Sequence, residues 1–367
     1  MAIVNPLSTP KGVTLSCELC HSPAYIQCNG CKVTYYCDKD HQRADWDSIH
    51  EKICQLLIPV RAPVPFLNSA EERTHSMEQL LLRKKHIIEL TTKEAQRLVY
   101  EGRHIDVIPA ATHALSFSID VHGLTSVELV LVYLILAEAN IGLGNLTQAE
   151  EYLSHASWTV LKTAECSNII RSKLHHNLGL LYSAKGQFED SLYHLSNNVY
   201  YASTVSGPND ISTSGGFFQM ANIFFRQNKM VIADSLYTEV TDIWHSHLSK
   251  LVDDQIQASI RSDSVWFIDA DHESLDENQE AEALQILSAI LDIRAQAAKK
   301  EPAKMADILH GLTMLFFLQG DFHKAHEWGK RLLQIIQQLP KYDKSDSIAA
   351  LIQSIERKLS TKQVTSS

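Results

Sequence analysis

Apolar residues between about residue 76 and residue 357 recur at spacings of three and four positions, the pattern of helices that bury one face. Gly102, Gly144, Gly186 and Asn228 lie 42 residues apart, each between two such segments. Glycine and asparagine tolerate the left-handed backbone conformation that ends many helices. The pattern therefore predicts consecutive helical hairpins with a period of 42 residues.

The residues around these turns repeat as well, because small side chains follow the large apolar ones at matching positions. The repeated steps are Leu136-Ala137, Leu178-Gly179 and Met220-Ala221, and a later unit reads Leu312, Phe316, Gly320, Phe322, Ala325. Small residues allow the close helix approach that stacked hairpins need. The pattern resembles the tetratricopeptide repeat, which implies an all-α solenoid over residues 76–357. A plain α-helical bundle is the alternative, and the unit at Gly102 matches least well because Pro109 falls inside its expected second helix.

The segments outside the repeats are polar or rich in proline. Residues 55–75 are predicted to be a linker, because they contain Pro59, Pro63 and Pro65. Residues 1–16 are predicted to be an N-terminal tail, and residues 358–367 a disordered polar tail.

An acidic stretch interrupts the repeats. Residues 253–282 contain ten acidic residues and one basic residue, Arg261. We interpret this stretch as a solvated insertion whose apolar middle, residues 265–268, packs on the helices, since repeat proteins tolerate long insertions. A docking site for a basic partner is the alternative interpretation.

Ahead of the repeats, six of the seven cysteines form a regular series with two histidines. The series reads Cys17-x2-Cys20, Cys28-x2-Cys31, Cys37-x3-His41 and His50-x3-Cys54. Such short steps let one turn of chain supply two of the four ligands of a tetrahedral zinc ion, so eight residues predict two closed, structural zinc sites. A disulfide framework is the alternative, and it is disfavoured because residues 1–16 lack the apolar core of a secretory signal.

The spacing over residues 17–54 resembles the MYND-type zinc finger. The resemblance implies an interleaved pairing, with Cys17, Cys20, Cys37 and His41 on the first zinc and Cys28, Cys31, His50 and Cys54 on the second. It also implies a groove for proline-containing peptides lined by Gln42 and Trp46, although Trp46 could instead be a core aromatic residue. The chain departs from the family in two ways, because His41 stands where cysteine is usual and the interval from His41 to His50 is one residue longer than the commonest form.

Charge and hydropathy exclude two classes of partner. The whole chain has a net charge of −10, and the predicted finger has four basic and six acidic residues, so neither offers the basic face that nucleic acid requires. The sequence contains no apolar run of about 18 residues, which predicts that no helix crosses a membrane.

The motifs predict a binding protein and not an enzyme, and no small-molecule substrate is expected. Lysine methyltransferases that join a MYND finger to helical repeats are the closest enzymatic alternative, but the interval from Cys54 to Ser76 is too short for their catalytic domain. The order of finger and repeats resembles the MYND zinc-finger proteins of sperm flagella and motile cilia. That resemblance implies a cytoplasmic, axonemal scaffold near the inner dynein arms, with dynein components and another tetratricopeptide protein as partners. A nuclear or cytoplasmic corepressor-type adaptor that reads proline-rich peptides is the other hypothesis.

Overall fold

The computed structural model describes residues 2–3, 14–63, 67–262, 275–297, 300–339 and 342–365. The described chain is almost entirely α-helical, with a small module at its N-terminus that carries the eight predicted zinc ligands, which confirms the predicted fold class. The chain is divided into two compact units, residues 1–186 and residues 187–367. Among the described residues, every helix is too short or too polar to cross a bilayer.

The N-terminal module combines a small sheet with one continuous helical segment. Strands β1 (Ala2–Ile3), β2 (Ile26–Gln27) and β3 (Tyr35–Tyr36) form an antiparallel sheet in that order. The helical segment follows as α1 (Lys39–Asp45), the π-helical turn η2 (Trp46–His50) and α2 (Glu51–Arg61). The pairing of β1 with β2 differs from the predicted N-terminal tail.

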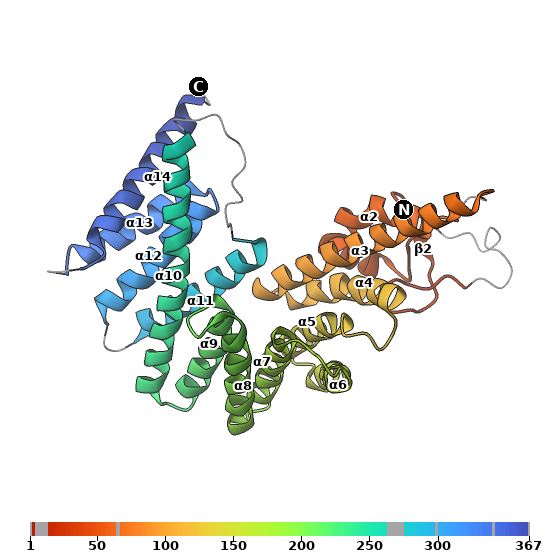
Figure 1. Ribbon diagram of the computed structural model, residues 1–367, viewed down its shortest axis with the longest axis horizontal. Coiled ribbons are helices and arrows are strands. Elements are labelled where there is room, and N and C mark those ends of the chain that lie inside the picture. The colour runs from red at the N-terminus through yellow and green to blue at the C-terminus, as the bar shows by residue number, and fades with distance from the viewer. Residues whose placement is uncertain are drawn as a thin grey trace. The chain divides into compact units, whose positions relative to one another are not determined.

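Helical hairpins make up the rest of the first unit. Its helices are α3 (Ala70–Tyr100), α4 (His104–His122), α5 (Leu129–Gly142), α6 (Leu146–Lys162) and α7 (Asn168–Ala184). Helix α3 packs along α4, and α5 packs along α6 (Figure 1). Gly102, Gly144 and Gly186 have φ values of 73°, 79° and 77° directly after α3, α5 and α7, so these residues end helices in the left-handed conformation, as predicted.

The second unit continues the same arrangement. Its helices are α8 (Phe188–Ser206), α9 (Ile211–Arg226), α10 (Met230–Ser262), α11 (Glu277–Gln296), α12 (Pro302–Leu318), α13 (Phe322–Ile336) and α14 (Ser345–Thr365). The closest pairs are α9 with α10 and α12 with α13. Asn228 turns between α9 and α10 at φ 59°, and Gly320 turns between α12 and α13 at φ 73°. The hairpins have the order of an α-helical solenoid, and their assignment to the tetratricopeptide repeat stays a prediction.

The finger shares a hydrophobic core with the first hairpin. Ile49, Ile53 and Leu57 are at most 1% exposed, and they pack in one cluster with residues of α3 and α4 such as Ile87 and Leu98. Polar contacts join the same surfaces, because Ser48 Oγ donates to the Asp106 carbonyl at 2.6 Å and Lys52 Nζ lies 2.6 Å from Glu94 Oε2. The finger is therefore built into the first unit and is not a separate module on a tether.

Helices extend into the predicted linker and into the predicted acidic insertion. Helix α2 continues to Arg61 because Ile53 and Leu57 bury its apolar face, and α3 begins at Ala70 behind the capping side chain of Ser69, so the connection is much shorter than residues 55–75. Within residues 253–282, α10 continues to Ser262 and α11 begins at Glu277. The apolar middle at residues 265–268 lies outside the described residues.

Helix α14 also differs from the sequence prediction, whereas α4 forms where a helix containing Pro109 was expected. Helix α14 runs to Thr365, past the predicted start of a disordered tail, and Ile348, Leu351 and Ile355 bury its inner face. Helix α4 continues through Pro109, which is buried in its second turn. The loss of one backbone hydrogen bond near a helix start is offset by the apolar contacts of this helix.

Candidate metal centre

Two similar turns hold the four cysteines of the Cys-x2-Cys steps. The amide of His21 donates to the Cys17 carbonyl at 3.0 Å, and the amide of Lys32 donates to the Cys28 carbonyl at 3.0 Å. His21 and Lys32 both have left-handed φ values, 57° and 59°. Each turn therefore bends the chain so that both of its thiols face the same point.

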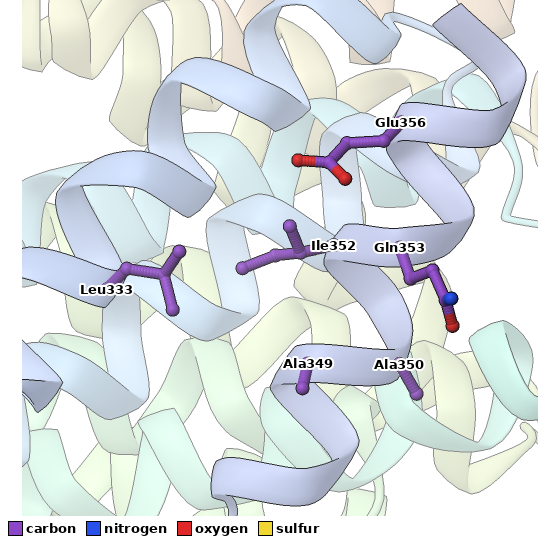
Figure 2. Close-up of a pocket in the computed structure, with 6 residues that line it drawn as sticks. All are labelled: Leu333, Ala349, Ala350, Ile352, Gln353 and Glu356. Atoms are coloured by element: carbon purple, nitrogen blue, oxygen red, sulfur yellow. The ribbon is translucent and has the colours of Figure 1, made fainter. Parts of the chain in front are cut away.

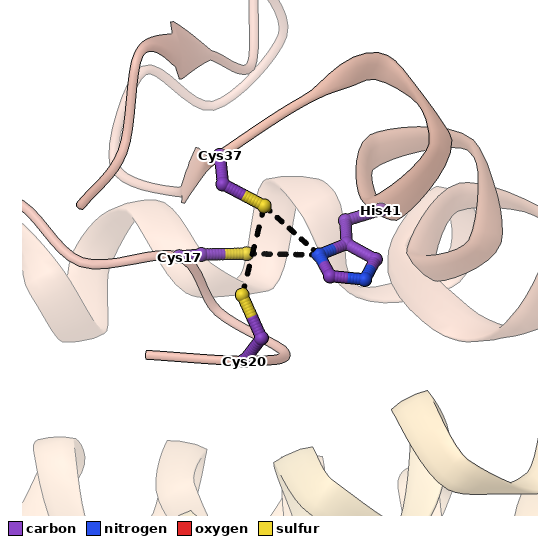
Figure 3. Close-up of side chains that lie close together, drawn as sticks. All are labelled: Cys17, Cys20, Cys37 and His41. Carbon is purple, nitrogen blue, oxygen red and sulfur yellow. Dashed lines mark hydrogen bonds between the residues drawn. The ribbon is translucent and has the colours of Figure 1, made fainter. Parts of the chain in front are cut away.

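The first cluster brings together Cys17, Cys20, Cys37 and His41 (Figure 3). Cys20 Sγ lies 3.6 Å from Cys37 Sγ, and His41 Nδ1 lies 3.6 Å from Cys17 Sγ and 3.0 Å from Cys37 Sγ. Asp38 begins α1 by accepting a hydrogen bond from the His41 amide at 2.8 Å, which places His41 one turn beyond Cys37. Cys20 is exposed, so this cluster lies at the surface.

The second cluster brings together Cys28, Cys31, His50 and Cys54, all of them buried. Cys28 Sγ lies 3.9 Å from Cys54 Sγ, and His50 Nε2 lies 3.7 Å from Cys31 Sγ. Gly30 packs against this group so closely that a Cβ atom there would lie 2.9 Å from Cys54 Sγ. Sequence analysis did not single out Gly30, although a glycine inside a Cys-x2-Cys step is a usable signal of such crowding.

Both clusters fit tetrahedral zinc and neither fits a disulfide. With zinc–ligand bonds of about 2.0–2.3 Å, tetrahedral ligand atoms lie about 3.6–3.8 Å apart. The thiol–thiol and thiol–imidazole separations of 3.6–3.9 Å match that range, while the 3.0 Å between Cys37 and His41 is shorter. A disulfide would need about 2.05 Å between sulfurs. The eight residues therefore hold two structural zinc ions in the interleaved pairing.

The π-helical turn η2 accounts for the extra residue between His41 and His50. A π turn accommodates one more residue than an α-helix over the same length. Here it spans Trp46–His50 within the helical segment that carries both histidines. The one-residue excess over the commonest MYND spacing is absorbed in this turn, and His50 and Cys54 still face the second cluster.

Asp45 lies behind the second cluster and is completely buried. Its Oδ2 accepts a hydrogen bond from the Tyr36 hydroxyl at 2.6 Å and lies 3.3 Å from His50 Nδ1, and its Oδ1 lies 2.9 Å from His113 Nε2. Burial alone would raise the pKa of Asp45, but the charge of His113 and these hydrogen bonds outweigh it and hold that pKa well below its usual range. Asp45 is therefore an ionised carboxylate with three buried partners.

A second carboxylate continues this buried network. Glu18 Oε1 lies 3.3 Å from His113 Nδ1, and Arg61 donates to both Glu18 oxygens at 2.5 and 2.8 Å. Burial by itself would raise the pKa of Glu18. The Arg61 hydrogen bonds and the His113 charge lower that pKa by more, so it lies below its usual range. The network connects the finger with α4, which carries His113.

The two residues predicted to line a peptide groove are on adjacent helical turns of the finger. The Trp46 side chain is 39% exposed, and its ring lies 5.8 Å from the His50 ring, so the indole covers the second cluster and still presents an edge to solvent. Among the hydrogen bonds within the described residues, none reaches the buried Gln42 Oε1. Trp46 is thus neither a wholly buried core residue nor a free surface one.

Comparison with known proteins identifies this module. Residues 14–54 match the family described as zf-MYND: MYND finger. The N-terminal module is a MYND finger. The MYND finger includes all eight ligand residues, so each of its two clusters offers four protein ligands to a zinc ion. Among solved structures, the crystal structure of BtubC (BKLC) from P. vanneervenii matches with 16% sequence identity and a TM-score of 0.30, over 70% of this chain and 93% of that chain.

A surface hollow in the second unit is the other candidate site. It lies between α13 and α14 and encloses about 540 Å³ (Figure 2). Its lining consists of Leu333, Ala349, Ala350, Ile352, Gln353 and Glu356. The lining is mostly alkyl, and it contains no pair of a nucleophile and a base, so it offers no catalytic arrangement.

The half-buried His245 and the buried His310 form a separate polar cluster between α10 and α12. His245 Nε2 lies 2.9 Å from His310 Nδ1, and Ser249 Oγ lies 3.4 Å from His245 Nδ1. Burial lowers the pKa of His245 to about 4, and burial together with the neighbouring His245 lowers the pKa of His310 to about 3. Lys344 adds to both shifts, whereas Asp307 opposes them. The pair is therefore neutral at pH 7.

The neutral histidine pair predicts acid sensitivity in the second unit. Unfolded histidines bind protons below about pH 6.5, whereas the folded pair stays neutral down to about pH 4, so the free energy of unfolding falls as the pH drops through this window. The loss approaches about 1.4 kcal/mol per pH unit for each histidine.

Hydrogen exchange of the α10 and α12 amides between pH 6.5 and 4.5, corrected for intrinsic rates, measures this effect in the full chain. The variant H245Q/H310Q keeps polar side chains that do not titrate, so its free energy of unfolding should depend less steeply on pH. An equally steep pH dependence in that variant would contradict the assignment to His245 and His310.

Proposed function

We propose that this protein is a non-enzymatic adaptor whose helical hairpins bind another protein and whose MYND finger adds a second contact. One observation carries the proposal. Both metal clusters have four protein ligands, so the residues that could perform chemistry in the finger serve to hold its fold. MYND fingers are protein-interaction modules, and helical arrays offer the extended surfaces that binding proteins use.

For the location, we propose the axoneme of sperm flagella or motile cilia, close to the inner dynein arms. Inner-arm dynein components and a second tetratricopeptide protein are the proposed partners. The support is the order of a MYND finger followed by repeats with a period of 42 residues. Affinity purification of the full-length protein from ciliated or testis cells tests this proposal. Recovery of axonemal dynein-related proteins supports it, and recovery of nuclear corepressors alone overturns it.

The finger also supports a role in peptide reading. Trp46 presents an exposed indole edge beside the second cluster, and Gln42 lies one helical turn before it. Proline rings pack well on indole faces. Proline-rich peptides are therefore the proposed ligands of this surface.

Replacing Trp46 by alanine should weaken the binding of a proline-rich peptide by at least tenfold, since truncation of a central aromatic contact typically costs about 2 kcal/mol or more. Isothermal titration with the full-length protein measures this. Trp158→Ala removes a more exposed tryptophan from α6, outside the finger, and serves as the control. Zinc content must stay at two ions per chain in both variants. Equal affinities of the two variants would exclude the groove.

A further inference from the structure

We propose that His113, a residue of α4 outside the MYND finger, is a positioning residue for the second zinc site. His113 is buried, and its Nε2 lies 2.9 Å from Asp45 Oδ1. The other oxygen of Asp45 lies 3.3 Å from Nδ1 of His50, whose Nε2 faces the zinc position. The chain of contacts therefore runs from α4 through one carboxylate to a metal ligand.

The orientation of a metal-bound imidazole depends on the group that faces its second nitrogen. When His50 Nε2 binds zinc, Nδ1 carries the proton, and Asp45 Oδ2 is the acceptor that faces it. Asp45 is fully buried, so water does not hold it in place. Tyr36 contacts Oδ2 and His113 contacts Oδ1, so each oxygen of Asp45 has a protein partner. Without His113, the carboxylate loses its partner on Oδ1 and the direction that it imposes on His50.

His113 is itself held in place by the finger. Its Nδ1 lies 3.3 Å from Glu18 Oε1, and the two-pronged contact with Arg61 fixes that carboxylate. Each ring nitrogen of His113 thus faces a carboxylate oxygen. The Arg61 guanidinium also lies 5.6 Å from the Phe117 ring, so α4 contacts Arg61 as well. This closed set of contacts is specific to a finger docked on α4.

Asp45, His50 and His113 are close enough together to suggest a third metal site. The hydrogen-bonded arrangement explains their proximity better. A metal there would have to displace the proton from His50 Nδ1 while Nε2 is bound to zinc, and Asp45 Oδ2 already accepts from Tyr36. The structure therefore assigns these residues to a hydrogen-bonding role, and full occupancy is two zinc ions per chain.

The experiment measures zinc release from the full-length protein into excess chelator, with the first site identified by the variant Cys20→Ser. His113→Leu should speed the release of the second zinc by roughly 10–100-fold, the usual effect of losing an outer-shell partner. His113→Gln places an amide N–H near the position of Nε2, and it should restore most of the slow release. The first zinc should be released at an unchanged rate in both variants.

A merely structural role for His113 is excluded with a matched variant. Val107→Ala truncates another fully buried residue of α4 in the core shared with the finger, without touching the network. If Val107→Ala speeds release of the second zinc as much as His113→Leu at equal loss of stability, the positioning role is overturned. Faster release that His113→Gln does not reverse, or a content of three zinc ions, would also overturn it.

Discussion

Removing zinc will unfold the MYND finger and loosen α3 and α4, while residues 187–367 stay folded. Structural zinc supplies about 10–16 kcal/mol of apparent folding free energy to modules of this size. The finger covers α3 and α4 with Ile49, Ile53 and Leu57 in one core, whereas the second unit has a core of its own. The loss of structure that follows zinc removal should therefore spread into the first hairpin through these apolar contacts, and it should not extend beyond the first unit.

Hydrogen exchange with and without chelator, under reducing conditions, measures this spread. Amides of α3 and α4 should exchange faster after chelation, and amides of α12 and α13 should not change. The two ions should leave in order, because Cys20 in the first cluster is exposed while the second cluster is buried. Unchanged protection in α3 and α4 would show that the finger is energetically independent of the hairpin.

Replacing Asp45 by alanine should destabilise the first unit by about 3–5 kcal/mol, the usual cost of removing one partner from a buried ion pair. The change leaves the Tyr36 hydroxyl and the His113 imidazole without their acceptor in a region that water does not reach. Asp45→Asn keeps the shape and one acceptor oxygen, so its effect should be smaller.

Urea unfolding of the zinc-loaded protein, combined with hydrogen exchange in α4, measures the change. Asp47→Ala is the matched control, because it removes the same charge from the next helical turn at an exposed position. Surface substitutions of this kind usually change stability by no more than about 0.5 kcal/mol. A similar loss of stability in both variants would mean that the total charge of the helix matters and the Asp45 contacts do not.

Local patterns in the sequence determined the ligands and the turns. Each metal-binding step has two or three residues between its ligands, so the spacing of Cys17 and Cys20, or of His50 and Cys54, is set by one turn of chain. Gly144 and Asn228 could be recognised for the same reason, because a left-handed φ is a property of single residues. The all-α fold and the two zinc sites therefore followed from the sequence.

The sequence did not predict where the helices begin and end. Proline and polar composition predicted a linker after Cys54 and a disordered end after residue 357, and both predictions depended on short-range propensity. In the structure, Leu57 of α2 is wholly buried in a core shared with α3 and α4, and Leu359 of α14 packs on the core of the second unit. Apolar burial of that kind outweighs local preferences, which cost about 1 kcal/mol or less for most residues and about 3 kcal/mol for a proline such as Pro59 inside α2.

By itself, then, the sequence determined that this chain has a two-zinc MYND finger followed by helical hairpins. Only the tertiary structure decided that the finger is fused to the first hairpin, that η2 absorbs the additional residue before His50, and that His113 stands behind the second zinc site. The physical reason is distance along the chain. Ligand spacing and turns are local and leave a pattern, whereas a buried contact between Asp45 and His113 depends on how two separate elements pack.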